Sequence, residues 1–232
     1  RVLVSGRWGF AASDGMDDVQ GTIVEASKAA KALSRGARSD TALFDVKPVR
    51  KDVRPKVKEP LAEVDLEDKV SYLSSICKGV VRADARLTTA KASYLDITGE
   101  RVLVTSDGAS VTNELSHAYM MTTSSGKAYG RPVSARDEVG TVTSGWEFFT
   151  RKNPEESVAD RLVRKAKLQM DGVPCKRGTY PCVLSPRVAG MLAHEALGHL
   201  SEADYSSSGA FDGLQGKRVA PESVTMVDSP WM

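Results

Sequence analysis

The sequence predicts an α+β fold, in which helices and strands occupy separate stretches of the chain. Two observations lead to this prediction. Apolar residues recur every three or four positions in several stretches, which is the period of an amphipathic helix. Between residues 81 and 149 the pattern changes to short β-prone runs separated by glycines, which favours an antiparallel sheet.

The first predicted elements are a β-hairpin and a helix. Residues 2–4 and 8–11 are β-prone and are joined at Ser5-Gly6, a dipeptide that suits a tight turn. From residue 17 to 33 apolar side chains repeat at helical spacing, and Gly36 follows as a stop signal; the repeat consists of Val19, Ile23, Ala26, Ala30 and Leu33. We therefore expect residues 1–46 to form part of an N-terminal domain of mixed α/β structure.

Residues 47–64 are predicted to be a linker. Three prolines, Pro48, Pro55 and Pro60, lie among lysines and arginines, and such a segment can neither continue a helix nor bury much surface. The positive charge could bind an acidic partner, but this composition is more typical of a solvated connector.

Residues 65–172 are expected to form a central domain that begins with a helix and continues as a sheet. Asp65 can cap the helix, whose apolar stripe is Leu66, Val70, Leu73 and Cys77. The β-prone runs are residues 92–97, 101–104, 118–123 and 139–143, and the glycines between them are Gly99, Gly108, Gly126 and Gly145. These runs predict an antiparallel sheet of short strands.

A second helix closes this domain, and a third opens the last segment, residues 173–232. Asn153-Pro154-Glu155-Glu156 is typical of a helix start, and the apolar face that follows is Val158, Leu162, Ala166 and Met170, before Gly172. Residues 181–184 then read as a buried strand. Ser185-Pro186 again combines a cap with a proline at the first helical position, which predicts a helix through His199.

Composition narrows the possible function classes. The chain has 32 Lys and Arg against 30 Asp and Glu, and a net charge of +2 does not suit a nucleic-acid-binding protein. Its three cysteines are too few and too odd in number for a disulfide framework. Because we find neither a membrane-spanning apolar run nor a signal-peptide core, we expect a soluble, cytoplasmic protein. The chain starts without Met and stops abruptly, so we also expect it to be part of a longer protein.

One motif carries chemistry. His194-Glu195-Ala196-Leu197-Gly198-His199 resembles the H-E-x-x-H zinc helix of metalloproteases with one residue added, giving H-E-x-x-x-H. On a regular helix, residues five apart point about 140° away from each other, whereas residues four apart diverge by about 40°. The two histidines can therefore share a metal only through a π-bulge or through a helix that ends near Gly198.

The residue types suggest a hydrolytic site. Neutral imidazoles bind zinc well, so His194 and His199 are the predicted metal ligands. Glu195 would lie beside the metal and act as the general base for the attacking water, whose pKa zinc lowers toward about 7. The predicted reaction is hydrolysis of an amide bond. In the competing interpretation, the histidines are structural and the protein is a non-catalytic binding protein.

A catalytic zinc site needs three protein ligands, and the residues around the motif leave the third one open. Cys175 and Cys182 match no zinc-knuckle spacing, and we expect them to be buried, inert thiols. Glu202 and Asp204 could be ligands, residues that orient the histidines, or loop acids. His117, far from the motif in the sequence, is expected to be a packed or surface histidine.

The motif and its surroundings closely resemble the TldD/PmbA family, metallopeptidases once described as modulators of DNA gyrase. The similarity covers nearly the whole chain, including residues 1–4 and 8–11, and is most specific between residues 180 and 228. The segments that carry it there are Cys182–Pro186, Leu192–His199, Glu202–Asp204, Gly213–Gly216 and Val224–Asp228.

This resemblance implies a catalytic, TldD-type member that cleaves unfolded or extended peptides and assembles as a homodimer or with a related subunit. It also implies that His194 and His199 hold zinc, that Glu195 is the catalytic acid–base, and that residues 173–232 begin a β-rich metallopeptidase domain. The family's third zinc ligand is a cysteine near the C-terminus. No cysteine follows Cys182, so we expect that ligand beyond residue 232. The non-catalytic alternative corresponds to a gyrase-modulator type of protein.

Overall fold

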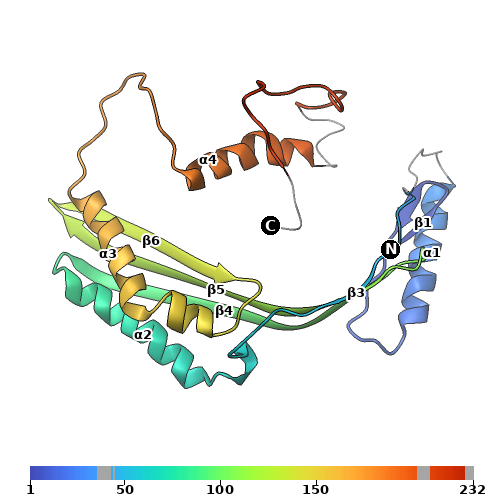
Figure 1. Ribbon diagram of the computed structural model, residues 1–232, viewed down its shortest axis with the longest axis horizontal. Coiled ribbons are helices and arrows are strands. Elements are labelled where there is room, and N and C mark those ends of the chain that lie inside the picture. The colour runs from blue at the N-terminus through green and yellow to red at the C-terminus, as the bar shows by residue number, and fades with distance from the viewer. Residues whose placement is uncertain (36–42, 44, 203–209, 228–232) are drawn as a thin grey trace. The chain divides into compact units, whose positions relative to one another are not determined.

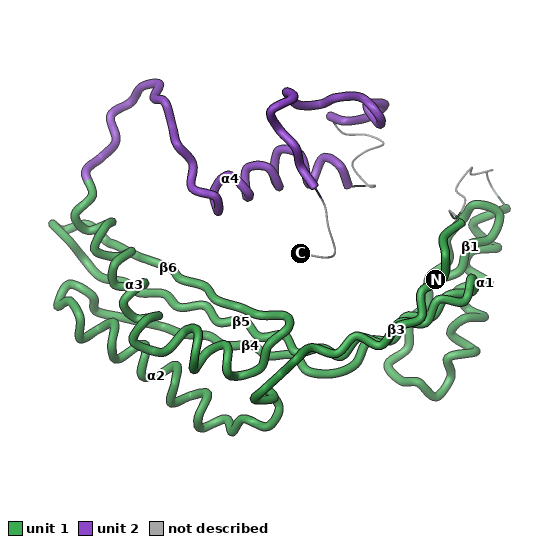
Figure 2. The backbone as a smooth tube through the Cα atoms, in the orientation of Figure 1, with its two compact units in different colours: residues 1–172 green, residues 173–232 purple. Residues whose placement is uncertain are grey.

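The computed structural model describes residues 1–35, 43, 45–202 and 210–227. Contacts between Cα atoms divide the chain into two compact units, residues 1–172 and residues 173–232, which Figure 2 shows in separate colours. Unit 1 contains all the strands of the described residues and three of the α-helices, α1 to α3. Unit 2 contains the helix that carries the histidine motif.

The N-terminal hairpin and helix form as predicted. Strands β1 (Val2–Val4) and β2 (Arg7–Gly9) pair antiparallel, and Ser5 and Gly6 have the positive φ angles that the tight turn requires. Helix α1 (Val19–Ser34) begins at Asp18, whose carboxylate accepts a hydrogen bond from the Gly21 amide at 2.7 Å. Gly36, the expected stop signal, lies outside the described residues.

Only the small residues of the predicted α1 stripe are buried. Ala26 and Ala30 pack against β2, where a Cβ on Gly9 would lie 1.9 Å from the Ala26 carbonyl oxygen. The larger members of the stripe, Val19, Ile23 and Leu33, are exposed. The close approach of the two backbones explains this difference, because it leaves space for alanine but not for branched side chains.

The main sheet of unit 1 is mixed: its strands between residues 81 and 149 pair antiparallel as predicted, and a short strand before them adds in parallel. Its strands are β3 (Arg50–Val53), β4 (Leu87–Val104), β5 (Ser110–Ala128) and β6 (Arg131–Thr141). β4 pairs antiparallel along one edge of β5, while β6 pairs antiparallel and β3 pairs parallel along different parts of the other edge (Figure 1). Hairpins connect β4, β5 and β6, whereas β3 is separated from its partner by α2 and β4, so its direction is not set by a hairpin.

Strand β3 lies within residues 47–64, the segment predicted to be a linker. The side chains of Arg50–Val53 are all exposed, and their backbone pairs with residues 110–113. Further along, Leu61 is buried in the 3₁₀ turn η1 (Leu61–Glu63). An edge strand held by backbone hydrogen bonds needs no apolar side chains, which is why the composition gave no sign of it.

The predicted short strands merge into long ones, because two of the expected breaks lie inside strands. Gly99 is within β4 and Gly126 within β5. A Cβ on Gly126 would lie 2.0 Å from the Arg86 carbonyl oxygen, so this glycine permits close backbone approach. The turns between strands occur at Gly108, as predicted, and at Tyr129-Gly130, and φ is positive at these residues.

Helices α2 (Leu66–Ala83) and α3 (Glu155–Met170) cover one face of the sheet (Figure 1). The whole predicted α3 stripe is buried, with Val158, Leu162, Ala166 and Met170 each at most 2% exposed. The predicted α2 stripe is wrong. Leu66 and Val70 are exposed, Leu73 and Cys77 are half-buried, and the buried side chains are Tyr72, Ile76 and Val80.

The rotation of α2 is set by an aromatic cluster. The Tyr72 ring packs edge-on against Trp146 and Phe149, with centroid separations of 5.3 and 6.1 Å. Adjacent positions on a helix point about 100° apart, so burial of Tyr72 and Ile76 turns the predicted stripe partly toward solvent. Cys77 is left at the margin of the core, where burial raises the pKa of its thiol.

An ion-pair network joins α3 to the sheet. Asp137 of β6 is 5% exposed, and its carboxylate accepts hydrogen bonds from Arg161 at 3.1 Å and from Lys165 at 2.5 Å, both on α3. Burial alone would raise the pKa of Asp137, but the hydrogen bonds from the two cations outweigh it and hold this pKa below its ordinary value. The buried carboxylate is therefore charged and paired.

Unit 2 is built around one helix. Helix α4 (Pro186–Ala193) continues through the π-helical turn η3 (His194–Gly198) into the 3₁₀ turn η4 (His199–Ser201). None of the described residues from 173 to 227 is buried, and none lies in a strand, so the expected β-rich character is not seen in this part of the chain. Throughout the described ranges, no helix is long and apolar enough to cross a membrane.

Two predictions for unit 2 are wrong. Residues 181–184 form no strand, and the side chain of Val183 is fully exposed. Cys175 and Cys182, expected to be buried, are exposed free thiols. The physical reason is shared: an apolar segment is buried only where a second layer packs on it, and none of the described residues of unit 2 forms such a layer.

Candidate metal centre

The helix that carries the motif starts where the sequence predicted. Ser185 precedes Pro186 at the first helical position, and the Ala189 amide donates to the Ser185 carbonyl at 2.9 Å. After Ala193 the helix widens into the π-helical turn η3, in which the His199 amide donates to the His194 carbonyl, five residues earlier. This is the π-bulge alternative of the two ways to align the histidines.

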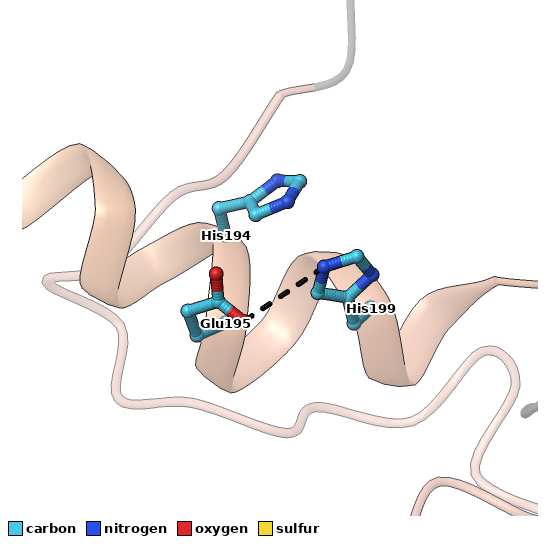
Figure 3. A group of neighbouring side chains, drawn as sticks. All are labelled: His194, Glu195 and His199. Atoms are coloured by element: carbon cyan, nitrogen blue, oxygen red, sulfur yellow. Dashed lines mark ion pairs between the residues drawn. The ribbon is translucent and has the colours of Figure 1, made fainter.

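The wider turn brings both imidazoles to one side of the helix. Their ring centroids are 4.4 Å apart, with 66° between the ring planes (Figure 3). The Glu195 carboxylate lies beside them, and its Oε2 atom is 3.8 Å from Nε2 of His199. One donor atom from each of the three side chains lies within 4.8 Å of the other two. The structure therefore brings together all three residues that the motif predicted.

Gly198 gives the His194 ring its space. A Cβ at position 198 would lie 3.3 Å from Nδ1 of His194, which is tighter than an ordinary van der Waals contact. The backbone angles of Gly198 are helical, with φ −58° and ψ −62°, so the glycine is not needed to end the helix. Its lack of a side chain, and not its flexibility, is what the site uses.

Glu202 contacts the other nitrogen of His199. Its Oε1 atom is 2.8 Å from His199 Nδ1, at hydrogen-bond distance. The sequence left three roles open for this residue, and the geometry places it against a predicted ligand instead of in the donor cluster. Asp204 lies outside the described residues. His117 belongs to β5, and neither Cys175 nor Cys182 is in the donor cluster found among the described residues.

The donor atoms are accessible to solvent. His194 and Glu195 are exposed and His199 is half-buried, with 60% of the Glu195 side chain and 47% of the His199 side chain accessible. Histidines that served only to fill a core would be buried, whereas these side chains are accessible to solvent. The arrangement can instead bind a cation from solution and leave room for water and a substrate.

A groove beside the motif was missed at the sequence level. Leu197 and Ser201 form one of its walls, and its volume is about 520 Å³. The opposite wall comes from the segment between Phe211 and Met226 and includes Val219, Pro221 and Val224. The only available signal was the large apolar side chain of Leu197 inside the motif, and that signal does not identify what packs opposite it.

Two family models match the chain and together cover most of it. Residues 59–170 match the PmbA/TldA metallopeptidase central domain, and residues 177–232 match the PmbA/TldA metallopeptidase C-terminal domain. The segment from α2 to α3 and the helix that bears the motif thus fall within domains of one family.

Curated relatives support the same assignment. A metalloprotease of Methanocaldococcus jannaschii is 27% identical over 98% of this chain and 50% of its own length. A zinc metalloprotease TldD homologue of Saccharolobus solfataricus is 40% identical over 75 residues, which are 32% of this chain and 17% of its own. The chain spans about half the length of the curated relatives that it matches along its whole extent.

Solved structures share the fold. A proposed modulator of DNA gyrase from Bacteroides thetaiotaomicron has a TM-score of 0.66 at 14% identity, covering 85% of this chain and 45% of the other. A second such protein, from Thermotoga maritima, has a TM-score of 0.57 at 12% identity, covering 76% and 38%. At these identities the likeness concerns the fold alone.

Proposed function

The chain belongs to the PmbA/TldA metallopeptidase family, and on that premise we propose that it carries the centre of a zinc-dependent peptidase site. The observation that supports this most directly is the grouping of His194, Glu195 and His199 on one turn of helix, with donor atoms within 4.8 Å. Family membership identifies the class of protein, and the grouping of these three side chains supports our proposal of where its chemistry takes place.

The donor set suits zinc. Two imidazoles and a carboxylate are nitrogen and oxygen ligands of the kind that zinc binds, whereas magnesium and calcium prefer sites made of oxygen alone. We assign His194 and His199 as ligands and Glu195 as the neighbouring base. The family resemblance implies a cysteine as the third protein ligand, and no cysteine follows Cys182 in this sequence.

Each residue then has a defined task. A zinc ion bound here supplies a Lewis acid that polarises the peptide carbonyl and makes water easier to deprotonate. Glu195 takes a proton from the attacking water and afterwards returns it to the nitrogen of the leaving amine. His194 and His199 would hold the ion through their ring nitrogens. Exposure of the Glu195 carboxylate keeps it within reach of water and peptide.

We further propose that the substrates are unfolded or extended peptides and that the active protein is a homodimer or a heterodimer with a related subunit. Extended peptides commonly bind through their backbone, by adding to the edge of a sheet. Such binding selects for the conformation of the peptide more than for its side chains.

The cytoplasmic location expected from the cysteine content is consistent with exposed free thiols at Cys175 and Cys182.

The competing function is a non-catalytic binding protein with structural histidines. The exposed positions of His194 and Glu195 argue against it, because these side chains are not packed into a core of the described residues. The two functions make different demands on Glu195: a general base needs its carboxylate, whereas a structural role for the histidines does not.

The test compares full-length protein with its Glu195→Gln variant, using metal analysis and cleavage of unfolded peptides. We expect stoichiometric zinc in both proteins and loss of cleavage by about 10²-fold or more in the variant, because only the base is removed. Glu222→Gln, which changes an exposed glutamate paired with Arg218 in the same unit, is the control. A metal-free wild-type protein, or undiminished cleavage by Glu195→Gln, would overturn the proposal.

A further inference from the structure

We infer that Glu202 is a positioning residue, which acts through His199 and determines which of its ring nitrogens faces the metal position. The inference rests on the proposed metal site. It starts from one contact, the 2.8 Å separation between Glu202 Oε1 and His199 Nδ1.

That contact selects a tautomer. A carboxylate only accepts hydrogen bonds, so Nδ1 of His199 must carry the proton that the bond requires. In the neutral ring the lone pair then lies on Nε2. Nε2 is also the nitrogen that faces Glu195, 3.8 Å from its Oε2 atom (Figure 3). The free lone pair and the donor cluster are therefore on the same side of the ring.

The backbone around Glu202 makes the contact a local and defined one. Turn η4 ends at Ser201, and the Glu202 amide donates to the His199 carbonyl at 3.2 Å. The hydroxyl of Ser201 donates to the Leu197 carbonyl at 2.6 Å, which ties the end of this turn to the π-helical turn before it. A carboxylate three residues after the histidine is thereby folded back onto its ring.

Orientation of the His199 ring accounts for most of the effect that we expect Glu202 to have on zinc affinity. Both side chains are about half-exposed, 47% for His199 and 46% for Glu202, so water screens the attraction between charges. Keeping the ring in one tautomer and one orientation is not screened in this way. Removing such outer partners of metal ligands commonly costs 10- to 100-fold in metal affinity, and the exposure here favours the lower end, about tenfold.

The experiment measures zinc affinity of the full-length protein by competition with a chromophoric chelator. We expect Glu202→Ala to bind zinc about tenfold more weakly. Glu202→Gln should lie between it and wild type, because the amide oxygen still accepts a hydrogen bond. Glu222→Ala removes a carboxylate of the same unit that pairs with Arg218, and it should leave zinc affinity unchanged.

A second readout follows the tautomer itself. Imidazole ¹⁵N shifts of His199 in the metal-free protein, recorded well above the ordinary histidine pKa of about 6.5, should show the proton on Nδ1 in wild type and a loss of this preference in Glu202→Ala. A change that only loosened the fold would lower stability without moving the tautomer.

The outcomes separate this inference from the proposed function. If wild type binds zinc and Glu202→Ala binds it equally well, the role of Glu202 is refuted while the peptidase proposal stands. If wild type binds no zinc, the peptidase proposal fails, and the shifts still test Glu202. A proton found on Nε2 in the metal-free wild-type protein overturns the inference in either case.

Discussion

Neutralising Asp137 should destabilise unit 1 and remove part of its dependence on pH. In Asp137→Asn the shape is kept, but Arg161 and Lys165 lose a charged acceptor that is 5% exposed. A hydrogen bond to a charged group contributes about 1.5–3 kcal/mol, and breaking a buried ion pair costs about 3–5 kcal/mol. Because the two cations are about a third exposed and can regain water, we expect a loss near the lower limit, about 2 kcal/mol.

The sign of the pH effect follows from the lowered pKa of Asp137. A carboxylate whose pKa is lower in the folded state contributes stability above its ordinary value, and this stability is lost as the pH falls through the folded-state pKa. Urea unfolding should therefore show the full gap between wild type and Asp137→Asn at pH 7 and a narrowing gap below about pH 4.

The control for this measurement is Glu114→Gln, which breaks an exposed pair with Arg54 at 4.0 Å and should change stability by less than about 0.5 kcal/mol. An Asp137→Asn variant as stable as wild type at pH 7, or a gap that stays constant down to pH 3, would refute the reasoning.

Two further changes test how glycines shape the molecule. Gly145→Ala should lower the unfolding free energy by about 3 kcal/mol in urea titrations. The added Cβ would lie 2.0 Å from the Glu59 carbonyl oxygen and disturb the hydrogen bond that this oxygen accepts from the Trp146 amide. A loss below about 1 kcal/mol would contradict this contact. Gly198→Ala should bind zinc about threefold more weakly than Gly190→Ala, since displacing the His194 ring from its rotamer costs roughly 0.5–1 kcal/mol. Gly190→Ala is the matched control, because a Cβ at Gly190 meets nothing within 4 Å and both changes favour the helix equally. Equal affinities in chelator competition would rule out the clearance role of Gly198.

Local signals in the sequence were enough to predict α3 and the start of α4. In both cases a proline at the helix start and a regular apolar stripe or motif lie within one segment, so no distant residue is needed to interpret them. Helix α2 shows the opposite case. Its own apolar stripe was misleading because the position of Tyr72 is decided by Trp146 and Phe149, more than 70 residues away in the chain.

Glycines and edge strands were misjudged for a related reason. Gly126 looked like a break in a strand, but the Arg86 backbone packs against it, and such contacts leave no mark on neighbouring residues. Strand β3 has four exposed side chains and is held in the sheet by backbone pairing, so its side-chain pattern did not reveal it. Contacts between residues far apart in the chain therefore decided both the place of Gly126 inside a strand and the formation of β3.

The candidate site was predictable in its members but not in its geometry. The spacing of His194 and His199 required an irregular turn, and the structure shows which of two turns is used. The contact of Glu202 depends on where η4 ends, and a shift of one residue would turn its carboxylate away from the ring. Spacing arguments alone could not choose among the roles open to this acid.

The absence of buried side chains among the described residues of 173–227 has a consequence for the energetics of metal binding. A helical stretch of this length has little stability of its own, since most helical stability in proteins comes from packing. A cation that binds both His194 and His199 would therefore crosslink a segment that makes few packing contacts of its own. The free energy of metal binding would then include the free energy of ordering that segment, so a contact that stabilises the helix should raise the metal affinity.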